Sequence, residues 1–316
     1  MAENTRKLPR LGIAEPTTTS LARLLSQAFP LTWETALIGT ILIASLVTRL
    51  WNLDARVMSH DESLHVFYAW QLAIGKGFAH NPMMHGPFLF ESTALMNVLF
   101  GASDFTSRLV SAILGTFVVV IVPQLLKPWL GRMGALITSA LFLISPYILY
   151  YSRYIRHDIQ VIAWMLLAVV AIFRYLNDRR DRHLFLLAAA IALMFATMET
   201  AFIYLAIFAS FLAARLIVTQ RRRWPAIRKS AEFDLLIVLV TLGAFFSSPI
   251  ALVVLNPIWT QLTGAPFVDL QALGSQGIDW AIGLTGVRLW GLLAGFSIGA
   301  IAIGWWWGGK RWLKLA

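Results

Sequence analysis

The sequence contains no cysteine, and charged residues make up only 13% of its 316 residues. The absence of cysteine excludes a disulfide framework and any zinc or iron–sulfur site with cysteine ligands. Soluble domains carry about a quarter charged residues, so the shortage of charge excludes a soluble enzyme and a disordered tail. Hydrophobic residues make up 58% of the chain, mostly in runs long enough to cross a bilayer. The composition therefore predicts an all-α, polytopic membrane protein.

The apolar runs predict a transmembrane helical bundle of about eight spans. The spans are expected at 36–51, 106–126, 135–151, 159–176, 184–198, 201–218, 235–255 and 289–307. A further run at 88–100 is short for a span, so we expect it to form a helix at the membrane interface. The predicted regions are a polar segment at 1–33 and a transmembrane domain at 34–316, with outer loops at 52–105, carrying short interfacial helices, and at 256–288.

The positive charge follows this topology. The formal net charge is +10, from 26 Lys and Arg against 16 Asp and Glu. If 88–100 does not cross, 19 of the 26 basic residues lie on the side that holds the N-terminus. The positive-inside rule then places both termini in the cytoplasm of a multi-pass plasma-membrane protein. The basic excess is explained by orientation in the membrane, and no nucleic-acid partner is expected.

Histidines and carboxylates gather on the predicted outer side, and the densest group is in the first outer loop. Ser59 and Glu62 have the spacing of a capping box, which explains Glu62 without any chemistry. Asp61 and His65 are expected on one helix face, a turn apart. The helix dipole keeps a first-turn carboxylate ionised. Asp61 is therefore a candidate general base or metal ligand.

Two more polar groups lie on the same side. His85 is in a loop whose prolines and glycine return it to the membrane surface, either as an interfacial histidine or as a site residue. Arg153 and Arg156 run against the positive-inside rule. They fit either lipid headgroups or a phosphate ligand, because the guanidinium fork matches phosphate oxygens. Asp158, at the head of an apolar helix, also fits a helix cap, and Glu199 fits a cap and a site residue equally well.

These segments resemble the GT-C superfamily of polyprenyl-phosphate-sugar-dependent glycosyltransferases. The motifs are HDE at 60–62, HGP at 85–87, LFG at 99–101, SRL at 107–109, SP at 145–146, YSR at 151–153, RHD at 156–158 and ATMET at 196–200. The chain looks most like the flippase-activity-associated family of archaeal-type N-glycosylation. That family is related to the protein O-mannosyltransferases and to the aminoarabinose transferase of lipid A.

The resemblance implies an inverting enzyme that moves a sugar from a polyprenyl-phosphate donor to a lipid, glycan or protein acceptor on the outer face. It implies that the pair Asp61 and Glu62 holds the catalytic carboxylate, with Asp61 as general base. It gives the donor phosphate to Arg153 or Arg156, which would stabilise the leaving group. Further candidates for substrate binding are Tyr151, Glu199 and His65.

The resemblance also implies a divalent-metal site like that of some superfamily members. The candidate ligands are Asp158 with His85 or His157. Mg²⁺ or Mn²⁺ would suit carboxylates, and Zn²⁺ would suit the histidines.

Two functions are left open by the sequence. The first is the glycosyltransferase, and the second is a non-catalytic flippase-associated or scaffold protein that binds a lipid-linked sugar. The family usually has lysine where Met198 stands, and this departure together with the short chain favours the second. A secondary transporter is less well supported, because no internal repeat is evident and the charged residues lie at the rim of the bundle.

Overall fold

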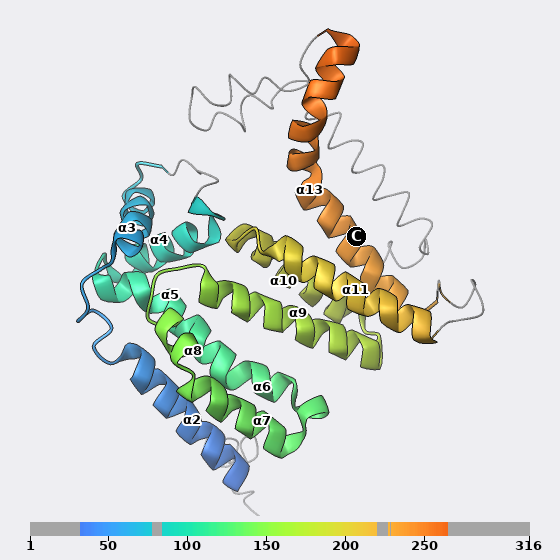
Figure 1. The fold of residues 1–316 in the computed structure, drawn as a ribbon. Helices are drawn as coiled ribbons and strands as arrows, with labels where there is room; N and C mark the ends of the chain where they lie inside the picture. The colour runs from blue at the N-terminus through green and yellow to red at the C-terminus, as the bar shows by residue number, and fades with distance from the viewer. Residues whose placement is uncertain (1–31, 78–83, 220–226, 228, 265–316) are drawn as a thin grey trace, which may run out of the picture.

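The computed structural model describes residues 32–77, 84–219, 227 and 229–264, and its regular elements in these ranges are all helical. They are α2 (Trp33–Leu50), α3 (His60–Ala73), α4 (Phe88–Phe100), α5 (Asp104–Thr116), the π-helical η2 (Phe117–Ile121), α6 (Val122–Leu125), α7 (Lys127–Ile144), α8 (Pro146–Tyr151), α9 (Asp158–Asp178), α10 (Asp181–Thr197), α11 (Ala201–Thr219) and α13 (Ala231–Thr263). The helices form an elongated bundle, and the predicted all-α fold is confirmed (Figure 1).

Four helical stretches in the described ranges are long and apolar enough to cross a membrane. They are Trp33–Leu50, Asp104–Leu125, Asp158–Asp178 and Ala201–Thr219. They confirm four of the predicted spans, while the predicted span at 289–307 lies outside the described residues. The apolar run at 88–100 forms α4, whose bounds are those predicted for the short interfacial helix.

Two predicted boundaries are corrected by the structure. The span expected at 135–151 is divided, because α7 ends at Ile144 and α8 begins at Pro146. A proline disfavours helical backbone at the residue before it, and Ser145, which precedes Pro146, is extended with ψ 118°. The helix expected at 235–255 runs as α13 from Ala231 to Thr263, so residues 256–263 of the predicted outer loop are helical. The rest of that loop lies outside the described residues.

The core follows α9, which packs along α10 and carries small residues at the contact. Ala168 and Ala171 are fully buried there, beside Leu187 and Ala190 of α10. Small side chains let membrane helices approach closely, and the dispersion contacts that result hold the helices together where lipid competes for apolar surface. The helix α9 is therefore the rigid support for the residues at its N-terminal end.

Ion pairs join neighbouring helices at the end of the bundle that holds the N-terminus of α2. Glu34 accepts hydrogen bonds from Lys127 and from Arg132, the latter over 2.6 Å. Arg215 of α11 pairs with Glu232 of α13 over 2.8 Å. The predicted topology assigns all of these basic residues to the cytoplasmic side.

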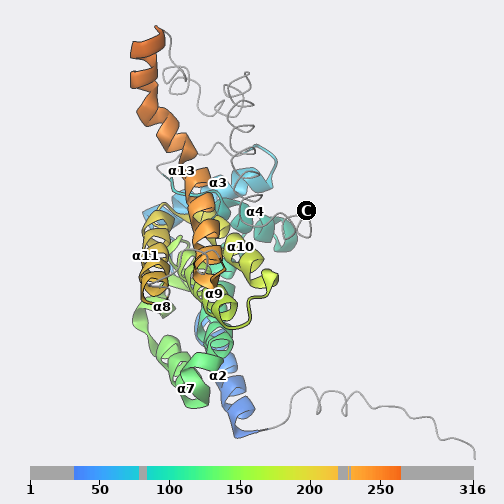
Figure 2. The same cartoon turned by 90° about the vertical axis from the view of Figure 1, so that its right-hand side faces the viewer.

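The helices α3 and α4 lie at the opposite end, beyond the C-terminus of α2 (Figures 1 and 2). The predicted capping box opens α3: the Ser59 hydroxyl accepts from the Glu62 N–H, and the Glu62 carboxylate accepts from the Ser59 N–H. The helix ends before Gly75, whose φ of +78° favours glycine. The first turn of α3 lies beside the segment that precedes α9, because the Ser59 hydroxyl is 2.7 Å from the Tyr154 hydroxyl and the Ile155 N–H donates to Glu62 over 3.3 Å.

Candidate active site

One arginine, Arg156, contacts both Asp61 and the first residue of α9, Asp158. Arg156 lies 3.6 Å from the Asp61 carboxylate through Nη1 and 3.3 Å from the Asp158 carboxylate through Nε. The side chains of Asp61, Arg156 and Asp158 are 53%, 41% and 23% exposed. The structure thus brings three of the predicted site residues together at an open surface, where a substrate could reach them.

Glu62 lies next to Asp61 in sequence but has a different environment. Its side chain is fully buried, and its two carboxylate oxygens accept hydrogen bonds from Arg108 over 3.1 and 3.2 Å. Arg56 donates over 2.6 Å, and the N–H groups of Ser59 and Ile155 also donate. Burial alone would raise the pKa of Glu62, but these hydrogen bonds, led by Arg108, lower the pKa below its ordinary value. Glu62 is therefore an ionised anchor joining α3, α5 and the start of α9.

The two predicted phosphate ligands also differ. Arg153 donates to the carbonyls at the C-terminal end of α2. Its Nη1 lies 2.8, 3.2 and 2.9 Å from the oxygens of Thr48, Arg49 and Trp51, and its Nη2 lies 2.9 Å from that of Asn52. These carbonyls have no helical partners, and a cation there also favours the helix dipole. Arg153 thus caps α2, whereas Arg156 keeps an accessible guanidinium.

His85 and Glu199 form a second pair beside this site. His85 Nδ1 lies 2.8 Å from a Glu199 carboxylate oxygen, and the His85 ring centroid is 5.1 Å from that of His157. The backbone of His85 has a φ of +64°, a conformation uncommon outside glycine. The loop is held there because Gly86 donates its N–H to the Thr197 carbonyl over 3.0 Å. This contact docks the His85 loop on the turn after α10.

Replacing Gly86 with alanine will undock this loop. An added Cβ would lie 2.1 Å from the Ala196 carbonyl oxygen, a backbone atom that cannot move aside without shifting α10. We expect a loss of about 1–3 kcal/mol in the free energy of unfolding, as for other overpacked positions. Chemical unfolding of the purified protein measures it. Gly39→Ala is the matched control, since nothing lies within 4 Å of its added Cβ. Equal stability of the two variants would contradict this docking.

His157, directly before α9, and Gln160 in the first turn of α9 form a buried polar pair. His157 is 1% exposed and Gln160, one turn on, is fully buried. Within the described part of the chain, neither ring nitrogen of His157 and neither amide atom of Gln160 has a hydrogen-bond partner. Burial, aided by nearby His65 and His85, lowers the pKa of His157 to about 3, and burial also lowers the pKa of His65. His157 is thus neutral at physiological pH.

The predicted metal ligands do not form a metal site. No group of three or more His, Asp or Glu side chains is placed to hold a metal ion within the ranges described. The Asp158 carboxylate faces Arg156, and His85 Nδ1 is engaged by Glu199. The residues expected to bind a divalent metal therefore do not fit that role here.

Two further predicted site residues, and one residue that was not predicted, make contacts inside the structure. His65 is largely buried, with its ring 5.3 Å from that of His157. Tyr151 packs among other tyrosines, with its ring centroid 4.6 Å from that of Tyr147. Arg108 is fully buried against Glu62, a role that the sequence patterns did not predict. One signal could have found it: an arginine near the start of an apolar span on the predicted outer side needs a partner.

The polytopic helical fold is that of the GT-C class of membrane glycosyltransferases, and comparisons with known proteins support this class. Residues 84–254 match the family model described as dolichyl-phosphate-mannose-protein mannosyltransferase. The match covers more than half of the chain, which therefore belongs to this family. The GT-C resemblance and its relation to the protein O-mannosyltransferases are confirmed.

The fold is similar to that of the S. cerevisiae protein O-mannosyltransferase Pmt1–Pmt2 complex bound to the sugar donor. The TM-score is 0.55 and the sequence identity is 21%, over 71% of this chain and 35% of that chain. The chain thus spans about a third of the solved relative, and the similarity is one of fold. No curated protein matches the chain.

Proposed function

We propose that this chain transfers a sugar from a polyprenyl-phosphate donor to an acceptor hydroxyl on the outer face of the membrane, with inversion at the anomeric carbon. The observation that carries the proposal is the pairing of a half-exposed carboxylate, Asp61, with an accessible arginine, Arg156, over 3.6 Å. In the proposed complex the substrate separates this pair, so that the carboxylate faces the attacking oxygen and the arginine faces the leaving oxygen. Membership of the mannosyltransferase family supports this class of reaction.

The proposed chemistry is a single displacement. The Asp61 carboxylate takes the proton of the acceptor hydroxyl, whose oxygen attacks the anomeric carbon as the bond from that carbon to the phosphate oxygen breaks. The polyprenyl phosphate leaves with the electron pair of that bond. Arg156 stabilises the negative charge on the departing oxygen, which is the end of the reaction where a cation is most effective.

Glu62 and Arg153 support this site as positioning residues. Glu62 has no exposed surface, and the five donors around its carboxylate leave it unsuited to proton transfer. Arg153 holds the end of α2 and leaves Arg156 as the proposed phosphate ligand. His85 and Glu199 border the site and are proposed to contact the substrate.

Transfer of radiolabelled sugar from a panel of polyprenyl-phosphate donors to endogenous membrane acceptors tests the function. We expect Arg156→Gln to lower kcat/KM for the donor by about 10- to 100-fold, the size of one lost ionic hydrogen bond. The loss combines a higher KM, because a contact with the donor phosphate is gone, and a lower kcat, because the leaving oxygen is less stabilised. Arg153→Gln is the matched control. Because Arg153 caps α2, that variant is expected to lose stability while the properly folded fraction keeps its KM.

The two open functions give different results in this assay. Wild-type transfer from any donor supports the enzyme. Donor binding with no transfer from the whole panel favours the non-catalytic, lipid-linked-sugar-binding protein instead. An unchanged KM in Arg156→Gln would overturn the proposed phosphate ligand.

A further inference from the structure

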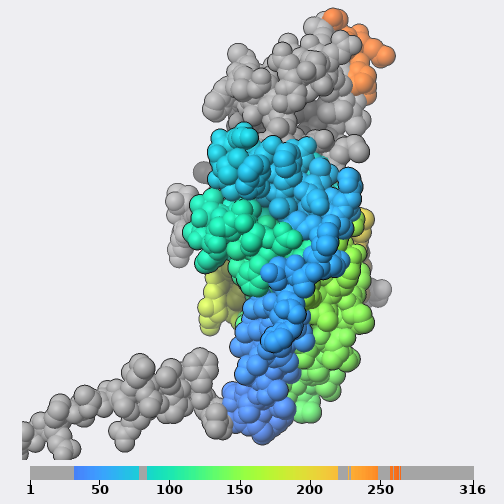
Figure 3. Space-filling model, turned by 90° about the vertical axis from the view of Figure 1, so that its left-hand side faces the viewer, coloured from blue at the N-terminus to red at the C-terminus, as the bar shows by residue number. Residues whose placement is uncertain are grey.

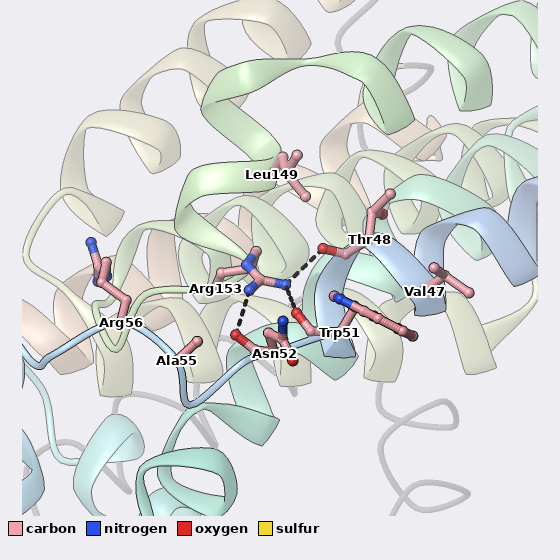
Figure 4. Close-up of a pocket in the computed structure, with 8 residues that line it drawn as sticks. All are labelled: Val47, Thr48, Trp51, Asn52, Ala55, Arg56, Leu149 and Arg153. Atoms are coloured by element: carbon pink, nitrogen blue, oxygen red, sulfur yellow. Dashed lines mark hydrogen bonds between the residues drawn. The ribbon is translucent and has the colours of Figure 1, made fainter.

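An open groove of about 880 Å³ lies on the flank of α2, near the end of the bundle that carries α3. Its walls are contributed by α2, by the linker from α2 to α3, by α8 and by Arg153. Figure 4 shows the lining side chains, and Figure 3 shows the flank of the molecule with α2 in blue. The apolar lining residues are Val47, Trp51, Ala55 and Leu149. An apolar groove on the surface of a membrane-spanning helix is accessible to lipid.

Both charged residues that line the groove are arginines. They are Arg56 and Arg153, and no carboxylate is among the described residues that line the groove. The Arg56 guanidinium is 5.0 Å from the Tyr154 ring centroid and its side chain is 48% exposed. Its partner Glu62 is shared with Arg108, so one negative charge faces two arginines and a net positive charge is left. Burial lowers the pKa of Arg153, and the nearby positive charges of Arg108 and Arg56 lower it further.

The groove is separate from the proposed reaction site. Asp61, Arg156 and Asp158 are not among its lining residues. Asp61 and Glu62 are neighbours on α3, but Glu62 is directed to Arg56 while Asp61 is directed to Arg156. A lipid phosphate held by Arg56 would therefore be bound by a different arginine from the one that faces the base.

We propose that this groove is a binding site for a membrane phospholipid with an anionic headgroup. One acyl chain lies against Val47, Trp51 and Leu149, and the phosphate accepts hydrogen bonds from Arg56. Because Arg56, Arg108 and Arg153 outnumber the single Glu62 carboxylate that pairs with Arg56 and Arg108, the local charge is positive. This excess favours an anionic headgroup such as phosphatidylglycerol over the zwitterionic phosphatidylcholine, whose choline would add a further positive charge. The lipid would join α2, α8 and the linker before α3.

Native mass spectrometry of the purified full-length chain tests this site. The protein is exchanged into detergent with equal amounts of dioleoylphosphatidylglycerol and dioleoylphosphatidylcholine, and the bound lipid is counted. We expect wild type to retain phosphatidylglycerol preferentially, and Arg56→Gln to bind it about tenfold more weakly, the effect of one lost hydrogen bond to a charged group.

Two further variants make the result specific to the groove. Ala55→Trp fills the groove from an exposed position, leaves the Arg56–Glu62 pair in place, and is expected to lower phosphatidylglycerol retention as strongly. Lys76→Gln removes an exposed positive charge of the first outer loop away from the groove, and should bind like wild type. Binding unchanged in Ala55→Trp, or equal retention of both lipids by wild type, would overturn the proposal.

A third arm separates the phospholipid from the sugar donor's lipid. Undecaprenyl phosphate is added to the phosphatidylglycerol complex. We expect both lipids to be retained together, whereas stoichiometric displacement of phosphatidylglycerol would assign the groove to the donor and overturn the proposal. The readout does not depend on sugar transfer, so its failure is distinct from failure of the proposed function.

Discussion

Asp61→Asn will abolish sugar transfer while leaving the protein folded in the membrane. The asparagine amide cannot take a proton from the acceptor hydroxyl, and a positioned base contributes about 10²- to 10⁴-fold to the rate. The side chain is 53% exposed and its contact with Arg156 is 3.6 Å long, so removal of its charge costs little stability. Transfer of labelled sugar by equal amounts of purified wild type and variant measures the loss.

Binding of the sugar donor is the control measurement for this result. Asp61→Asn keeps Arg156 and its contact with Asp158, so donor binding is expected to persist while transfer is lost. Asp158→Asn provides a matched change in the other carboxylate that faces Arg156, and should reduce transfer less. Full activity in Asp61→Asn, or an equal loss in both variants, would contradict the role of Asp61 as the base.

Local signals in the sequence predicted much of this architecture. The capping box of Ser59 and Glu62 and the short helix at 88–100 depend on residues close together in the chain, and both were predicted with the correct residues. The break at Pro146 was missed, because the apolar run continues on both sides of it and hydropathy does not record a lost backbone hydrogen bond.

The different environments of neighbouring residues could not be predicted from spacing. Glu62 is buried because Arg108, 46 residues away, reaches it from α5. Arg153 is not accessible to a ligand in the same way, because it donates hydrogen bonds to carbonyls at the end of α2. That helix lies about a hundred residues earlier in the chain. Such long-range contacts decide which member of each pair is accessible, and they depend on how the helices pack.

Glu62→Gln will destabilise the protein severely. Glu62 and Arg108 are both fully buried, and removal of one partner leaves the other charge uncompensated. Breaking a buried ion pair in this way costs about 3–5 kcal/mol, much more than changing an exposed charge. The free energy of unfolding, measured by denaturant titration in detergent, should fall by this amount in Glu62→Gln and hardly change in Asp61→Asn.

A double-mutant cycle distinguishes the buried pair from a loss of side-chain shape. Arg108→Met removes the other charge while keeping a long apolar side chain, and it should also be strongly destabilising alone, because Glu62 is then held only by Arg56 and the two backbone N–H groups. If the charges act on each other, the double variant Glu62→Gln with Arg108→Met will be more stable than the sum of the single losses predicts, by about 0.5–3 kcal/mol. Simple additivity would mean that Glu62 stabilises the fold through its other donors. In that case neither Asp61 nor Glu62 would depend on Arg108 for its contribution to stability, and the two carboxylates would differ only in their exposure.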